Sequence, residues 1–85
     1  MEKQVGRMNP YHRAVRATLA GMERERAVRW LAAHPLDQEE RDCIAEIDVY
    51  GHGAVQAADR LFLSTETVKR RRRTGYGRIA AALSG

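Results

Sequence analysis

Five consecutive cations, from Lys69 to Arg73, are the residues of this chain whose type and spacing point most directly to a chemistry. A cluster of Lys and Arg side chains neutralises the charge of a polyanion such as nucleic acid. Ser64, five residues before the run, is a favourable N-cap, and Val68 supplies one apolar anchor. The pattern predicts a helix that begins after Ser64 and presents cations to a polyanion.

A short amphipathic helix is predicted directly before this run, from Ala54 to Leu61. Its apolar residues recur at helical spacing on one face: Ala54, Ala57, Ala58 and Leu61. Small alanines allow a second helix to cross closely, and residues 62–64 would form the turn between the two. The sequence therefore predicts a helix-turn-helix whose second helix leaves its outer face free for a DNA major groove.

Charge is distributed unevenly along the 85 residues, which carry a formal net charge of +4. Residues 1–35 hold seven cations and three anions, residues 36–53 one and six, and residues 54–85 seven and two. Basic ends around an acidic middle favour an anionic partner, nucleic acid before membrane. The length predicts one small domain.

Cys43 is the only cysteine in the sequence, so the chain cannot form an internal disulfide, and this composition is typical of proteins in a reducing compartment. No stretch is long and apolar enough to span a membrane, and the start of the chain lacks a signal-peptide core. We therefore expect a cytoplasmic protein with no membrane partner. Cys43 and the three histidines lack paired metal-ligand spacing, so no metal, cofactor or catalytic residue is assigned and no enzymatic function is expected.

The N-terminal third divides into an arm and a helical segment. Residues 1–9 lack periodicity and are expected to form a flexible arm, whereas Asn9 and Pro10 form a helix-start signal. Residues 10–35 then form either one helix from Pro10 to Ala33 or two helices that break near Gly21. One helix could serve as the seam of a homodimer through residues 10–33. Two helices could fold back over the C-terminal bundle.

One further helix is predicted before the helix-turn-helix, and the basic helix has two possible ends. Asp37 and Glu40 have the spacing of a capping box, which predicts a helix that starts there and ends at the glycines of residues 51–53. The basic helix either stops near Thr74 or continues through Gly75 and Gly77, and the apolar positions after the glycines are in phase with Val68, which favours continuation. The predicted fold class is all-α, a small helical bundle with a C-terminal helix-turn-helix.

Residues 36–83 resemble region 4 of sigma-70-type transcription factors, the helix-turn-helix domain that binds the −35 promoter element. The matching stretches are Leu36 to Ile44, Tyr50-Gly51, Ala57 to Leu61, Leu63-Ser64 and Thr67 to Lys69. The resemblance implies that residues 36–85 form the DNA-binding domain. It is shared in part by the DNA-binding domains of response regulators, and small relatives without the other sigma regions are typical of phage or mobile elements.

Three positions depart from the pattern of that family. Phe62 stands at the turn position usually held by glycine, so the turn must either avoid a left-handed conformation or absorb strain. Arg72 replaces an aliphatic residue of the inner face, and Gly75-Tyr76 replaces alanine and leucine. Residues 1–35 match no other sigma region, so we do not expect a complete sigma factor.

The spacing of the basic helix and the matching family positions select the same base-reading residues: Thr65, Glu66, Lys69 and Arg70. The predicted phosphate contacts are Arg71, Arg72 and Arg73, with Arg60 and Gln56 on the preceding helix, for which a solvated role is an equal alternative. The leading hypothesis is a sequence-specific transcription regulator that binds double-stranded DNA. The alternatives are an adaptor that binds RNA polymerase or a sigma factor, and a phage DNA-packaging or architectural protein.

Overall fold

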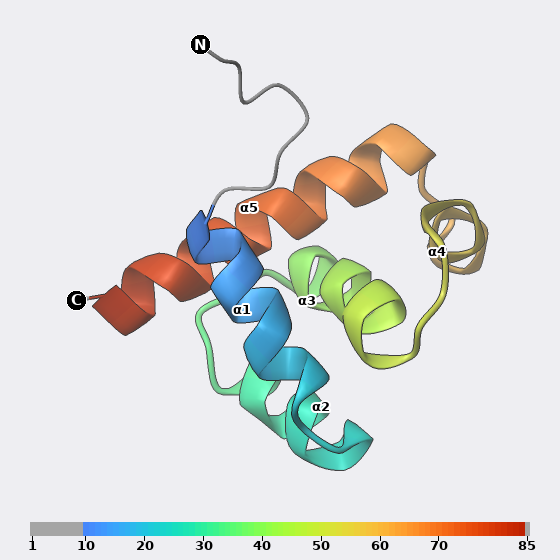
Figure 1. Ribbon diagram of the computed structural model, residues 1–85. Coiled ribbons are helices and arrows are strands. Elements are labelled where there is room, and N and C mark those ends of the chain that lie inside the picture. Colours follow the sequence, from blue (N-terminus) through green and yellow to red (C-terminus); the bar gives the residue numbers. More distant parts are fainter. Residues whose placement is uncertain (1–9, 85) are drawn as a thin grey trace, which may run out of the picture.

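The computed structural model describes residues 10–84, and every regular element among them is a helix. The elements are α1 (Pro10–Ala20), α2 (Arg24–Ala32), α3 (Gln38–Ile44), the π-helical segment η1 (Ala45–Val49), α4 (Ala54–Leu61) and α5 (Thr65–Ser84). In Figure 1, α5 runs across the molecule, α1 crosses it, and α4 lies beside its N-terminal end. The predicted all-α bundle with a C-terminal helix-turn-helix is confirmed. The arm predicted for residues 1–9 lies outside the described residues.

Residues 10–33 form two helices. The Gly21 amide donates to the carbonyl oxygens of Ala17 and Thr18, both at 3.2 Å, and the chain turns before α2 begins. The apolar faces of α1 and α2 are buried in the same core as side chains from α3 and α5; this core consists of Val15, Leu19, Ala27, Leu31, Leu36, Ile44, Tyr76 and Ile79. Most of the apolar face predicted as a dimer seam is therefore covered within one chain, whereas Tyr11 is 66% exposed.

α3 begins where its capping signal predicts. The Asp37 amide donates to Glu40 Oε1 at 3.0 Å, which is the return bond of a capping box. The helix then widens into the π-helical turn of η1, which the Tyr50 amide closes on the carbonyl oxygen of Ala45 at 2.9 Å. Gly51 follows with φ +77°, the left-handed conformation that glycine adopts readily after a helix.

α4 packs against α3 and α5 through a second core of small side chains. Cys43, Ala57, Ala58 and Val68 are buried there, with Leu61 and Leu63 packed at its edge. The two alanines lie where a close helix crossing was predicted, and Cys43 fills a position that has no access to solvent. This second core holds the start of α5 against the rest of the domain.

The turn between α4 and α5 places Phe62 in the left-handed region, with φ 59° and ψ 41°. The Leu63 amide donates to the carbonyl oxygen of Ala58 at 2.9 Å and closes the turn. The side chain of Phe62 is 93% exposed, so it contributes little packing to offset the cost of this conformation. Of the two alternatives for the turn, the chain therefore absorbs the strain.

Gly75 and Gly77 lie inside α5, which is continuous from Thr65 to Ser84. A Cβ atom at Gly75 would lie 2.6 Å from Ile44 Cδ1, closer than non-bonded carbon atoms pack, so the end of the Ile44 side chain would have to shift. Glycine at this position therefore allows α5 to pack directly on α3. A Cβ atom at Gly77 would meet nothing closer than His12 Nε2 at 3.8 Å.

Candidate nucleic-acid interface

The start of α5 sets the direction of every side chain in the basic run. Ser64 Oγ accepts a hydrogen bond from the Thr67 amide at 3.0 Å, and the Ser64 carbonyl accepts one from the Val68 amide at 3.0 Å. Val68 is fully buried against α3 and α4. With about 3.6 residues per turn, a buried Val68 directs Glu66, Lys69 and Arg70 outward, and all three are exposed.

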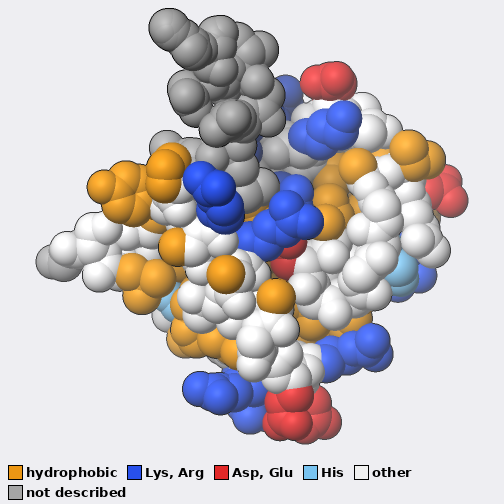
Figure 2. All heavy atoms as spheres, in the orientation of Figure 1, with side chains coloured by type: hydrophobic (Ala, Val, Ile, Leu, Met, Phe, Trp, Pro, Cys, Tyr) orange, Lys and Arg blue, Asp and Glu red, His pale blue; other side chains and the backbone are white. Residues whose placement is uncertain are grey.

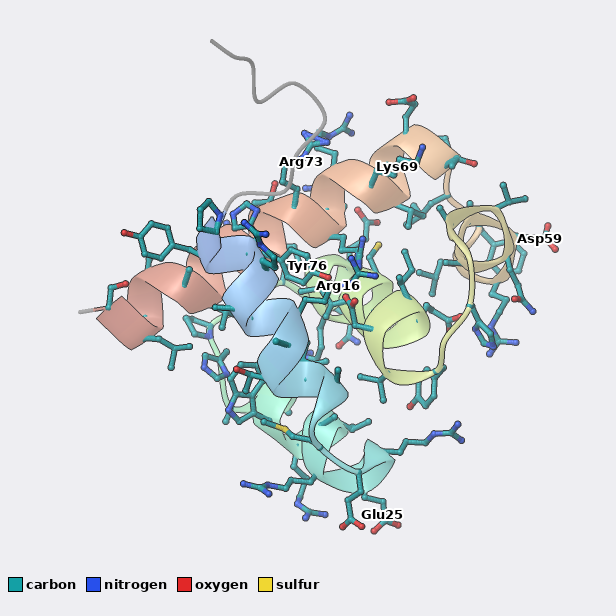
Figure 3. All side chains as sticks on the ribbon, in the orientation of Figure 1. Arg16, Glu25, Asp59, Lys69, Arg73 and Tyr76 are labelled. Atoms are coloured by element: carbon teal, nitrogen blue, oxygen red, sulfur yellow. The ribbon has the colours of Figure 1, made fainter. Side chains whose placement is uncertain are left out.

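The five cations divide between the two sides of α5. Arg71 and Arg72 point toward carboxylates of the bundle, whereas Lys69, Arg70 and Arg73 are exposed and pair with no carboxylate of residues 10–84. In Figure 3, Lys69 and Arg73 point away from the bundle on the outer side of α5. The structure therefore brings together three unneutralised cations and Glu66 on one exposed face, which we call the outer face of α5.

Arg72 lies on the inner side of α5, although it was predicted to contact phosphate. Its Nε and Nη2 atoms donate to Asp48 Oδ2 and Oδ1 at 2.9 and 2.7 Å. Its guanidinium carbon lies 5.0 Å from the centre of the Tyr76 ring, and the Tyr76 hydroxyl donates to the same carboxylate. Burial alone would lower the pKa of Arg72, but the hydrogen bonds and charge of Asp48 outweigh it and raise that pKa.

Arg71 is predicted to contact phosphate, and in the structure its Nε donates to Glu39 Oε1 at 2.7 Å. Both side chains of this pair are about 40% exposed, at 41% for Arg71 and 42% for Glu39. An ion pair this exposed is weak, because water screens both charges. Arg71 therefore lies at the border of the outer face with a charge that is only partly neutralised.

Arg60 and Gln56, the predicted contacts on α4, have different surroundings. Gln56 is exposed. Arg60 Nε donates to Glu46 Oε1 at 2.8 Å, and His52 Nδ1 lies 2.6 Å from the same oxygen. Burial would raise the pKa of Glu46, but the hydrogen bonds from His52 and Arg60 outweigh it and lower that pKa. This cluster joins η1 to α4, and Arg60 remains about half exposed beside it.

The base-reading residues predicted from sequence are not equally accessible. Glu66, Lys69 and Arg70 are exposed, whereas Thr65, the first residue of α5, is partly buried. Arg73, predicted only as a phosphate contact, shares the outer face with them. Sequence reasoning missed the carboxylates that hold the other arginines: Glu39, Glu40, Glu46 and Asp48. The excess of acidic residues between two basic segments was the available signal for this pairing.

No group of three or more His, Cys, Asp or Glu residues in the described part of the chain could hold a metal ion. None of the helices within residues 10–84 is long and apolar enough to cross a membrane. Comparisons with protein-family models, curated proteins and solved structures found no match for the chain.

Proposed function

We propose that this protein is a sequence-specific DNA-binding regulator of transcription that places α5 in the major groove. The observation that carries the proposal is the division of the basic run, which leaves Lys69, Arg70 and Arg73 exposed and free of carboxylate partners within residues 10–84. Val68 and the Ser64 cap hold the helix in a fixed orientation behind them. A rigid helix with an unneutralised outer face fits the geometry of helix-turn-helix recognition.

The roles proposed for individual side chains follow from their position on α5. Arg70 and Lys69 are suited to the acceptor atoms of guanine, and Glu66 to the amino group of cytosine. Arg73, farther along the same face, is suited to phosphate. Arg71 contributes a further phosphate contact when its exposed pair with Glu39 opens, whereas Arg72 holds the helix to η1 and touches no DNA.

The resemblance of residues 36–83 to sigma region 4 supports the same proposal from the sequence. The acidic helix from Asp37 to Asp48 and the Trp30 segment motivate the adaptor hypothesis. Trp30, however, packs partly buried against the core, and four carboxylates of the acidic segment lie within ion-pair distance of arginines of the same chain: Glu39, Glu40, Glu46 and Asp48. Those carboxylates already have intramolecular partners and are less suited to a basic protein surface. Double-stranded DNA is therefore the partner we propose.

Selection of bound duplexes from a random DNA pool tests the proposal. We expect a defined consensus, and we expect Arg70→Ala to relax the preference at one base pair by about 1–3 kcal/mol. Arg29→Ala is the matched control, because Arg29 is an exposed cation of α2 with no carboxylate partner within residues 10–84. This control should keep the wild-type consensus. Binding without any consensus would indicate an architectural protein, and no binding would refute the DNA proposal.

A further inference from the structure

We propose that α1 is a second DNA-contacting element, in which Arg13 and Arg16 bind the phosphate backbone beside the groove that holds α5. This inference rests on the proposed function and extends it to a helix that lies outside the stretch resembling sigma region 4. It predicts that α1 contributes affinity for DNA without contributing base preference.

α1 packs against the C-terminal half of α5, where the outer face of that helix continues. Helical spacing carries that face from Lys69 and Arg73 to Gly77 and Ala80. At these later positions α1 covers it: His12 Nε2 would lie 3.8 Å from a Cβ atom at Gly77, and a groove beside Ala80 is lined by Ala14 and Thr18 of α1. Figure 1 shows the same crossing of α1 over α5. DNA lying along the outer face would therefore meet α1 one turn beyond Arg73.

One side of α1, next to η1 and the middle of α5, carries its charges. Arg16 lies four residues after His12 and three residues after Arg13, so its side chain is a neighbour of both on the helix surface. The His12 ring lies 5.7 Å from the Tyr76 ring, and Arg16 Nε reaches toward Asp48 Oδ1. These two contacts orient this side of α1 toward α5 and η1. Figure 2 shows separate Lys and Arg side chains over the first half of α1 and over the N-terminal half of α5, on the same face of the molecule.

The charges on this side of α1 are poorly neutralised. Arg13 is exposed and has no ion pair with a described residue, and α1 itself contains no acidic residue. Arg16 is 58% exposed and lies 3.9 Å from Asp48, whose two oxygens already accept hydrogen bonds from Arg72. The pKa of His12 is lowered mainly by burial and also by the positive charge of Arg73. His12 of α1 therefore lies within the electric field of the outer face of α5. The positive potential of Arg13, Arg16 and Arg73 would attract a phosphate anion to this side of α1.

The length of α5 indicates which part of the duplex α1 would reach. From Lys69 to Gly77 the helix advances by about 12 Å at about 1.5 Å per residue. The major groove of B-DNA is about 12 Å wide. With α5 inclined across the groove and its first turns facing base edges, Gly77 therefore lies near the edge of the groove. The cations of α1 meet the sugar-phosphate backbone there, and not the bases.

The test compares Arg13→Ala and Arg16→Ala with Arg29→Ala, which removes one exposed cation from α2. Binding to the selected duplex and to a random duplex would be measured by fluorescence anisotropy over a series of NaCl concentrations. We expect each α1 variant to weaken binding to both duplexes by the same factor. The slope of log K against log salt should fall in magnitude by about 0.9 for each lost phosphate contact. Arg29→Ala should leave the slope unchanged, and Arg16→Lys should retain most of it.

The outcomes separate this inference from the proposed function. If wild-type protein binds the selected duplex and both α1 variants behave like Arg29→Ala, the α1 inference is wrong and the role of α5 stands. If wild-type protein binds no duplex, both proposals fail together. Arg13→Ala keeps the test valid even if Arg16→Ala unfolds, because Arg13 is exposed and makes no ion pair with residues 10–84. Ethylation interference should then identify the phosphates whose modification no longer affects the Arg13→Ala variant.

Discussion

Arg72 and Asp48 form a bidentate ion pair that joins α5 to η1, with Nε to Oδ2 at 2.9 Å and Nη2 to Oδ1 at 2.7 Å. The side chains are only 18% and 4% exposed. The hydroxyl group of Tyr76 donates to the same carboxylate. A buried carboxylate with this many donors explains how an arginine occupies a position on the inner face of α5 that favours an aliphatic residue.

Asp48→Ala should reduce the free energy of unfolding by about 3–5 kcal/mol, because it leaves Arg72 buried without a counter-charge. Urea denaturation followed by circular dichroism measures the change. Glu39→Ala breaks the exposed pair with Arg71 and is the control, with an expected cost below about 1 kcal/mol. Equal costs for the two variants would contradict the structural role of the Arg72–Asp48 pair.

Gly75→Ala should be less stable than Gly77→Ala, because only the methyl group at position 75 forces a neighbouring side chain to shift. A methyl group at Gly75 would force the buried Ile44 side chain to shift, and overpacking of this kind costs up to about 3 kcal/mol, which opposes the gain of about 1 kcal/mol in helix propensity. Gly77 has room for a methyl group and lies inside a helix, so alanine there should stabilise the protein by about 0.4–1 kcal/mol. Thermal unfolding of both variants measures these shifts. A Gly75→Ala variant as stable as Gly77→Ala would show that α5 does not pack on α3 this closely.

Phe62→Gly should be more stable than Phe62→Ala by about 1 kcal/mol, because only glycine adopts the left-handed conformation of the turn without steric cost. Both variants remove the same exposed ring, so lost packing cancels in the comparison. The difference between their urea midpoints reports the strain directly. If alanine proved equal to or better than glycine, the backbone at Phe62 would not be strained.

Burial raises the pKa of the Cys43 thiol from 9.0 to about 11, and nearby carboxylates add to the effect. The folded state therefore favours the neutral thiol, so the resulting stabilisation is fully present below pH 9 and is lost as the pH rises toward 11. Wild-type protein should lose stability relative to Cys43→Ala over this interval, as measured by urea unfolding at a series of pH values. Parallel pH profiles for the two proteins would contradict the burial of the thiol. At pH 8 the native thiol should react with a disulfide reagent only after unfolding.

Local signals in the sequence were sufficient for the parts of the fold that depend on a few neighbouring residues. The Ser64 cap, the Asp37–Glu40 capping box and the small alanines of α4 each appear in the structure where the pattern predicts them. These features depend on backbone geometry over one or two turns. The α4-turn-α5 unit could therefore be predicted from sequence alone.

The partners of the basic run could not be predicted in this way. Arg72 lies four residues after the buried Val68, so helical period already places it on the inner side of α5. Its partner Asp48, however, lies in the π-helical turn of η1, which changes the direction of every later side chain relative to an ideal α-helix. Which arginines are neutralised depends on that turn and on packing between distant segments.

Glycines illustrate the same limit within the helices. Gly21 lies at the end of a helix and Gly75 lies in the middle of one, although both interrupt an apolar pattern. Close contact with Ile44 requires the glycine at position 75, whereas the chain turns after position 21 so that α2 can bury Ala27 in the core. Tertiary packing decided between outcomes that local sequence left open.

The most direct test of the central claim compares two double variants that remove the same amount of charge. Arg70→Ala with Arg73→Ala removes two cations from the outer face of α5, whereas Arg26→Ala with Arg29→Ala removes two from α2. Fluorescence anisotropy at moderate salt measures the affinity of each for the selected duplex. We predict a loss of about tenfold or more for the α5 pair, from one base contact and one phosphate contact, and only a minor loss for the α2 pair. Equal losses for the two pairs, or no loss for either, would contradict recognition of DNA by α5.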